Sequence, residues 1–112
     1  SLSFKDPEYK RQYIGKLLTR DCAYHMGTTW GFLIGGFISA YCKVHRHDKA
    51  AIRSAEMMCE VFEDHLHDGC INGIAEIFDG EFAATSRGCF TQAWSVGEVL
   101  RDYTVDVLPY LD

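Results

Sequence analysis

Residues 48–69, DKAAIRSAEMMCEVFEDHLHDG, form the clearest amphipathic helix that the sequence predicts, and they decide its fold class. Asp48 is suited to accept hydrogen bonds from free amides of the first turn, and Gly69 is suited to end the helix. The apolar residues recur at intervals of three and four, which places them on one helix face. They are Ile52, Ala55, Met58, Cys59, Phe62 and Leu66. A helix with such a face needs neighbours that bury it.

Residues 30–44, which precede this helix across the polar turn of residues 45–47, are apolar on nearly every face. We therefore expect a helix that its neighbours enclose. Gly31, Gly35 and Gly36 cluster in it and indicate close approach of another backbone. The uncharged stretch of residues 26–42 contains Thr, Ser and Gly, and it is shorter than the about 20 apolar residues that span a bilayer. The sequence thus favours a buried helix and no membrane partner.

The first thirty residues are predicted to hold a short helix and a loop. Asp6 and Pro7 are a helix-start signal, because Asp accepts from free amides and Pro fits the first helical position. Gly15 interrupts the apolar pattern that follows. Residues 20–30, RDCAYHMGTTW, are dense in side chains that hydrogen-bond or stack, and we interpret them as a functional loop.

The last helix is predicted to begin near Thr91 or Ser95, either of which suits an N-cap, and to end at Pro109. Its inner stripe is Ala93, Val96, Leu100, Tyr103 and Val107. No stretch alternates between polar and apolar residues as a strand does. The prediction is an all-α chain of two or three long helices, a shorter one at the start, and two glycine-rich loops.

Composition limits the chain to one domain and excludes some partners. It has 112 residues and a formal net charge of -5, with no basic stripe, so nothing in it favours a nucleic-acid partner. No signal peptide is recognisable, and a start at Ser1 rather than Met suggests a fragment of something longer. Five widely spaced cysteines without a Cys-x-x-Cys pair suit free thiols in a reducing compartment, so we expect a cytoplasmic protein.

Residues 73–95 form the longest segment without a helical apolar period. Long connections of this kind are uncommon in compact domains and are either disordered or functional. Three phenylalanines, at positions 78, 82 and 90, argue against disorder, because disordered segments are poor in aromatic residues. Glycines at 73, 80 and 88 permit unusual backbone angles. We therefore interpret this segment as the functional centre.

Glu76 is the best candidate for a general base in that segment. Its neighbours Ala75, Ile77 and Phe78 are apolar and suited to remove water from a carboxylate. The alternative is a loop acid that faces solvent or caps the next turn. Asp79 and Glu81 are interpreted as plain loop acids, since Asp-Gly is a common turn pair.

His25, Trp30 and Trp94 are candidates for binding a neutral polar ligand, because the two indole rings offer an apolar face and an N–H donor that suit a sugar ring. Capping for His25 and core packing for both tryptophans are the alternatives. No metal site is predicted, because histidines two apart on a helix diverge and lack a zinc-finger spacing. The residues considered for it are His45, His47, His65, His67, Cys59 and Cys70.

Four pieces of the sequence, taken together, resemble the end of the amylo-α-1,6-glucosidase region of glycogen debranching enzymes. They are Asp6-Pro7-x-Tyr9, Arg20-Asp21-x-Ala23-Tyr24-His25-x-Gly27-Thr28-x-Trp30, Gly73-Ile74-x-Glu76 and Gly88-Cys89-x-x-Gln92-Ala93-Trp94-Ser95. Their order and spacing match over almost the whole chain. The resemblance implies helical hairpins that form the last part of an (α/α)6 toroid, with a sugar pocket at one end.

The resemblance also implies the chemistry. It implies inverting hydrolysis of the glucose that remains α-1,6-linked at a branch point of glycogen or limit dextrin, without cofactor or metal. Glu76 matches the family's general base, which activates the attacking water. His25, Trp30, Gln92 and Trp94 match loop positions that shape the glucose pocket. The family's general acid is an Asp on an earlier loop, and nothing in this chain matches it.

Two departures concern the details of the pocket. The family continues Gly-Thr-Val-Trp-Pro-Trp where this chain has Gly27-Thr28-Thr29-Trp30-Gly31-Phe32, and it often has Pro at the position of Ala75. These changes loosen the loop and remove one aromatic ring.

The length of the chain bears on what it does alone. A toroid of twelve helices needs several hundred residues, so we expect this chain to be an inactive fragment. Its expected partner is the missing N-terminal part of the domain. We also expect the fragment to self-associate through its uncovered apolar face. Two other functions stay open: another glycosidase on the same toroid, such as a glucoamylase or trehalase, or a non-catalytic helical module for glycan binding or self-association.

Overall fold

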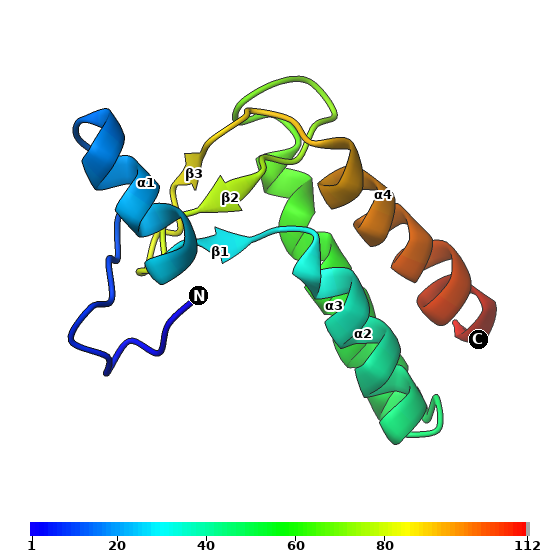
Figure 1. The fold of residues 1–112 in the computed structure, drawn as a ribbon. Helices are drawn as coiled ribbons and strands as arrows, with labels where there is room; N and C mark the ends of the chain where they lie inside the picture. The colour runs from blue at the N-terminus through cyan, green and yellow to red at the C-terminus, as the bar shows by residue number, and fades with distance from the viewer. Residues whose placement is uncertain (112) are drawn as a thin grey trace.

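Residues 1–111 of the computed structural model are described, and they are mainly helical with one small sheet (Figure 1). The all-α class is confirmed at this level. The elements are α1 (Leu17–Met26), β1 (Thr29–Trp30), α2 (Leu33–Val44), α3 (Lys49–His65), β2 (Ile77–Phe78), β3 (Ser86–Arg87), α4 (Ala93–Asp102), a π-helical turn (Tyr103–Val107) and a 3₁₀ turn (Leu108–Tyr110). In Figure 1, α1 lies on one side of the sheet and α2, α3 and α4 lie on the other.

Helices α2 and α3 form an antiparallel hairpin, as the polar turn between them predicted. Arg46 and His47 both have positive φ, and the His47 amide donates to the Cys42 carbonyl at 2.8 Å, which closes the turn. The predicted cap is confirmed, because the Asp48 side chain accepts from the Ala51 amide at 2.8 Å. Helix α3 ends at His65, four residues before the predicted end at Gly69.

The apolar core lies between α2, α3 and the turns that follow α4. Its buried members are Ile38, Cys42, Ile52, Ala55, Cys59 and Val107. Three of them come from the predicted face of α3, which confirms the inner stripe of that helix. Leu111, Tyr103 and Val99 pack against the same cluster.

The inner face of α4 and the π-helical turn agrees only in part with the predicted stripe, since Val107 is buried in the core and Tyr103 packs against it. Ala93 is exposed and Leu100 is 60% exposed, whereas Ser95, Asp102 and Asp106 are buried. Neither proposed cap is used, since Gln92 occupies the N-cap position without a side-chain hydrogen bond. The buried side of α4 is not the apolar side that the sequence predicts, because it forms a polar network with α2. Polar side chains leave no apolar period in the sequence.

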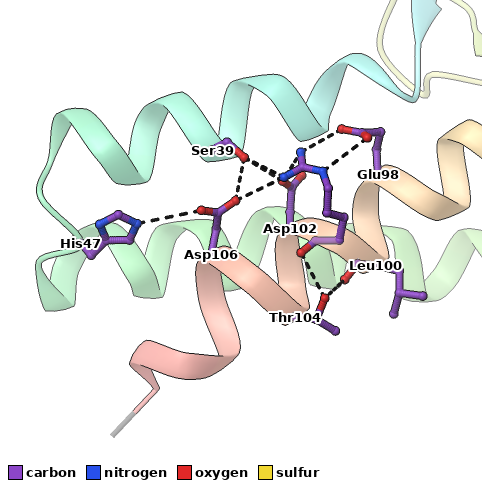
Figure 2. A network of polar contacts seen from close by, with 8 residues as sticks. Ser39, His47, Glu98, Leu100, Asp102, Thr104 and Asp106 are labelled. Carbon is purple, nitrogen blue, oxygen red and sulfur yellow. Dashed lines mark hydrogen bonds and ion pairs between the residues drawn. The ribbon is translucent and has the colours of Figure 1, made fainter.

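That network is centred on Ser39, Arg101 and the two buried aspartates. Figure 2 shows Ser39 facing Asp102 and Asp106. Ser39 Oγ lies 2.6 Å from Asp106 Oδ2 and 3.2 Å from Asp102 Oδ1, while Arg101 pairs with Asp102 at 2.8 Å. His47 reaches Asp106 from the end of the hairpin at 3.9 Å. Burial raises the pKa of Asp102 to about 6, although the Arg101 guanidinium and the Ser39 hydroxyl oppose the change.

Helix α2 is not enclosed, contrary to the expectation from its composition. Leu33 is 56% exposed, Phe37 is 54% exposed and Val44 is 76% exposed. The glycines of α2 do not all meet another backbone either, because a Cβ at Gly35 would meet the Glu98 side chain, whereas Gly36 faces open space. The Cα radius of gyration is 15.1 Å, against about 13 Å for a compact chain of this length.

The N-terminal helix starts later than predicted. Asp6 accepts from the Glu8 amide at 2.9 Å and so closes a turn instead of capping a helix. Gly15 has a φ of +92°, a backbone conformation that does not fit a helix, so α1 begins after it. The helix includes residues 20–26, which we expected to be a loop. Residues 9–13 belong to no helix or strand and contact residues 79–80, with Tyr9 Oη donating to the Gly80 carbonyl at 2.7 Å.

The sheet joins the two segments that the sequence analysis singled out as functional. Its order is β1-β2-β3 with antiparallel pairs, and Trp30 lies opposite Ile77 while Phe78 lies opposite Ser86. We predicted no strand, and two-residue strands are too short to show an alternating pattern. Within residues 1–111, no helix is both long and apolar enough to span a lipid bilayer.

Candidate functional site

Glu76 lies immediately before β2 and is held there by groups from three segments. It is 8% exposed, and its backbone binds both sides of the site, with its amide donating to the Cys89 carbonyl at 3.0 Å and its carbonyl accepting from the Gly31 amide at 3.3 Å. Its Oε2 accepts from the Cys89 amide at 3.1 Å, and its Oε1 accepts from the Tyr24 hydroxyl. A carboxylate accepts at about four lone-pair positions, so these two bonds leave room for a further donor.

The contact with Glu76 shifts the pKa of the Tyr24 hydroxyl. Its hydrogen bond to Glu76 is the largest cause that raises the pKa of Tyr24 to about 12, and burial and the charge of Glu76 add to it. The phenol therefore stays protonated at neutral pH and remains a hydrogen-bond donor to the carboxylate.

A cleft of about 510 Å³ opens beside this pair, and we call it the base cleft. It is lined by Tyr13, Arg20, Asp21, Tyr24, Glu76, Arg87, Gly88 and Cys89. Its lining combines two guanidinium groups, two phenols and two carboxylates, a composition suited to a ligand rich in hydroxyl groups. The Arg20 guanidinium lies 5.7 Å from the centre of the Tyr13 ring, which orients it across the cleft wall.

Four rings form a second surface next to Tyr24, here called the aromatic cluster: His25, Trp30, Phe32 and Trp94. His25 stacks on Trp30 with centroids 5.5 Å apart and an angle of 5°, and Phe32 stacks on Trp94 at 4.4 Å and 21°. The two indole rings meet edge to face at 6.2 Å. Trp94 is 47% exposed and His25 is exposed, so the cluster is no closed core and offers ring surface to a ligand.

The structure thus brings Glu76, His25 and Trp30 together around Tyr24, and Trp94 joins them through its contact with Trp30. Gln92 is placed nearby by its backbone, whose amide donates to the Ile74 carbonyl at 2.9 Å. Its side chain has no hydrogen bond to another described residue. Gln92 therefore marks the start of α4 and makes no side-chain contact with Glu76 by hydrogen bonding.

Asp79 differs from the plain loop acid that we predicted. It is 4% exposed, its Oδ2 pairs with Arg87 at 2.9 Å, and its Oδ1 accepts from the Tyr13 amide at 2.8 Å. The hydrogen-bonded turn lies at residues 81–84, where the Ala84 amide donates to the Glu81 carbonyl at 2.8 Å, and not at Asp79–Gly80. The Asp79 carboxylate instead fixes this loop to the N-terminal segment. Glu81 lies further out and contacts Gln12 and Arg11.

His65, at the end of α3, supports the residue before the base. Its Nε2 accepts from the Ala75 amide at 3.0 Å, so the neutral ring carries its proton on Nδ1, which lies 3.4 Å from Asp68 Oδ2. Its ring also packs edge to face on Phe78 at 4.9 Å. In the part of the chain that is described, no group of three or more Cys, His, Asp or Glu side chains is placed to hold a metal ion.

Two contacts of the site escaped the sequence analysis, although Gly88 itself was noted there for its backbone freedom. Tyr24 lies 52 positions before Glu76, and no periodicity links them. Gly88 has a φ of +67° and packs against the Glu76 carboxylate. The dense cluster of functional groups in residues 20–30 and the glycine in the long loop were the available signals, but neither indicates which atoms meet.

Comparison with known proteins adds one match. A family model described as amylo-alpha-1,6-glucosidase matches residues 1–101, a range that contains the whole base cleft and the aromatic cluster. Neither the curated proteins nor the solved structures gave a match.

Proposed function

The chain belongs to the amylo-α-1,6-glucosidase family of glycogen debranching enzymes, and from this premise we propose that Glu76 is the general base of an inverting glucosidase site. The substrate is a branched α-glucan such as glycogen or limit dextrin, from which the site releases the α-1,6-linked glucose. The observation that carries the proposal is the buried Glu76 carboxylate, held at both oxygens and facing the base cleft.

The chemistry needs a carboxylate of this kind. An inverting glycosidase uses one carboxylate to activate a water, and a protonated carboxyl about 6.5 to 9.5 Å away to protonate the leaving oxygen. Glu76 has lone pairs free for that water. Asp79 does not serve as the acid, because it is bound to Arg87 and to the Tyr13 amide. We propose that the acid comes from another part of the glucosidase domain.

The aromatic cluster is the proposed surface for the terminal glucose. Trp30 and Trp94 lie at 74° to one another, and sugar C–H groups pack on aromatic faces of this kind. Because Trp30 Nε1 already donates to the Tyr24 carbonyl at 3.1 Å, we propose that Trp30 contributes through its ring surface. His25 adds a polar ring on the same side. Gln92 is proposed to contribute through its side-chain amide, which is free of other hydrogen bonds among residues 1–111.

The open apolar faces support a place inside a larger (α/α)6 toroid. A groove of about 1040 Å³ runs along α2, α3 and the sheet, and it includes Leu33, Phe37 and Val61, all more than half exposed. Surfaces of this kind mark sites of contact with other elements. We propose that further helices of the domain cover the groove, and that the isolated chain self-associates through it and is inactive. A single monomeric species at all concentrations in sedimentation would contradict self-association.

The decisive experiment replaces Glu76 by Gln in the protein that contains this segment within its complete glucosidase domain. Release of glucose from limit dextrin should fall by about 10²- to 10⁴-fold, the usual contribution of a general base. Glu81→Gln is the matched control, since Glu81 makes exposed contacts outside the base cleft, and it should retain normal turnover. Near-normal turnover of Glu76→Gln would remove Glu76 from the mechanism.

Two alternatives are tested by the same proteins. Turnover of trehalose or of linear α-1,4 chains in preference to limit dextrin would favour another glycosidase with the same fold. Activity of neither kind, together with binding of glucan by the intact protein, would favour a non-catalytic module. The five free cysteines support the proposal of a reducing, cytoplasmic location.

A further inference from the structure

We infer that Tyr24 is a positioning residue for Glu76: its hydroxyl fixes the orientation in which the carboxylate addresses a water in the base cleft. The inference rests on the proposed function, because it assigns a role within the same reaction. It assigns no contact between Tyr24 and the substrate.

Tyr24 is itself held firmly. Its backbone carbonyl accepts from Thr28 Oγ1 at 2.6 Å and from Trp30 Nε1 at 3.1 Å, which ties the end of α1 to β1. Its ring packs edge to face on Trp30, with centroids 4.6 Å apart, and against His25 at 5.0 Å. A phenol with its backbone and ring fixed in this way delivers its hydroxyl to one place.

Glu76 needs such a donor because the last torsion of a Glu side chain is broad and only roughly two-fold. One anchor, the Cys89 amide at Oε2, leaves the carboxylate plane free to turn about that bond. The second anchor, at Oε1, comes from a different segment and defines the plane. Removing the Tyr24 hydroxyl leaves the first anchor intact, so the carboxylate stays in the cleft but loses its fixed direction.

The direction of the carboxylate matters for the rate. A general base must meet the proton that it removes at hydrogen-bond distance, and a misplacement of about 1 Å can lower a rate by about 100-fold. Tyr24 also contacts both Trp30 and His25, so the surface proposed to bind glucose and the base share one support. Tyr24 therefore helps to set the position of the bound sugar ring relative to the water that Glu76 activates.

The first test uses the chain alone and does not depend on catalysis. Tyrosine labelled with ¹³C at Cζ is observed by NMR between pH 8 and pH 11, and Tyr24→Phe assigns the signal among the six tyrosines. In the wild type the Tyr24 phenol should remain protonated at pH 11, and in Glu76→Gln it should be mostly ionised there. A wild-type Tyr24 that is half ionised near pH 10 would show that the two side chains do not bind, and would overturn the inference.

The second test is kinetic and uses the complete glucosidase domain. Tyr24→Phe should lower kcat on limit dextrin by about 10- to 100-fold with KM within about twofold of the wild type. Tyr41→Phe is the matched control, because Tyr41 lies on α2 outside the base cleft, where its ring packs on Phe37 and His45, and its hydroxyl binds no other residue within 1–111. It should leave kcat unchanged. An unchanged kcat in Tyr24→Phe, or an equal loss in both variants, would overturn the inference.

The failure of this inference is distinguishable from that of the proposed function. If Glu76→Gln is inactive and Tyr24→Phe is normal, Glu76 remains the base and Tyr24 has no positioning role. If Glu76→Gln turns over normally, both are overturned, even where the NMR titration shows the two side chains in contact. Phe keeps the ring packing of Tyr24, and an unchanged thermal midpoint of Tyr24→Phe would separate a kinetic loss from unfolding.

Discussion

Gly88 lies so close to Glu76 that a Cβ on it would stand 2.5 Å from Glu76 Oε2. It also has a φ of +67°, a region that residues with a side chain adopt only at a cost. Both constraints act on the loop that carries the first anchor of the carboxylate, the Cys89 amide at Oε2. A glycine in this loop is therefore part of how the base is placed.

Gly88→Ala should lower the free energy of unfolding by about 1 to 3 kcal/mol, through the strained φ, and displace the Glu76 carboxylate. Urea unfolding measures the first effect, and glucose release by the complete domain measures the second. Gly97→Ala is the control: Gly97 lies within α4 with nothing near its Cβ position, so Ala there should stabilise by about 0.5 to 1 kcal/mol. Equal stability of Gly88→Ala and the wild type would contradict the constraint.

His65 should contribute to stability through one hydrogen bond. Ala75 is 1% exposed, so His65→Leu leaves its buried amide without an acceptor and should cost about 1 to 3 kcal/mol in urea unfolding. His65→Gln keeps an acceptor at the right distance from the helix and should lose less. His67→Leu, at an exposed position, serves as the control. If Leu and Gln at position 65 cost the same, the hydrogen bond is not the source of the effect.

Asp102 should make the chain less stable as the pH rises from 4 to 7. Burial raises its pKa from 3.8 to about 6 in the folded state, so between these values the folded chain keeps a proton that the unfolded chain releases. Its contribution to the free energy of unfolding should therefore fall by about 3 kcal/mol over that range.

The measurement for Asp102 compares urea unfolding of the wild type and Asp102→Asn at pH 4 and pH 7. The amide cannot ionise, so the stability of Asp102→Asn relative to the wild type should increase with pH by that amount. Asp64→Asn, at an exposed position on α3, should show no such trend. A pH-independent difference for Asp102→Asn would mean that the carboxyl does not titrate with a raised pKa.

Trp94 should contribute to sugar binding through its exposed ring. Isomaltose is expected to quench the fluorescence of the two tryptophans, which both lie in the aromatic cluster. In Trp94→Ala the remaining signal comes from Trp30, and the affinity should fall by about 3- to 10-fold, as expected for one aromatic contact of about 0.5 to 1.5 kcal/mol. Phe82→Ala, which removes a fully exposed ring elsewhere in the loop, should bind as the wild type does. An unchanged affinity of Trp94→Ala would exclude this ring from the pocket.

Sequence patterns predicted the parts of the fold that depend on local and apolar signals. The α2–α3 hairpin, the Asp48 cap and the apolar face of α3 follow from spacing and capping, because the atoms concerned lie within a few residues of one another. Glu76, with apolar neighbours in a long loop, was also identifiable as a buried acid. Where burial is polar, the prediction held only in part: Tyr103 and Val107 face the core as predicted, but the buried side also holds Ser95 and Asp102 of α4 and Asp106 of the π-helical turn.

By itself the sequence determined that this chain is mainly helical, belongs to the amylo-α-1,6-glucosidase family and carries a candidate base at Glu76. Only the tertiary structure decided what surrounds that base. Tyr24 reaches it across 52 positions, the Cys89 amide reaches it across 13, and Asp79 is bound to Arg87 instead of standing free. The reason is physical: a repeat in the sequence reports which residues share a face of one element, whereas a hydrogen bond between segments depends on how those elements pack.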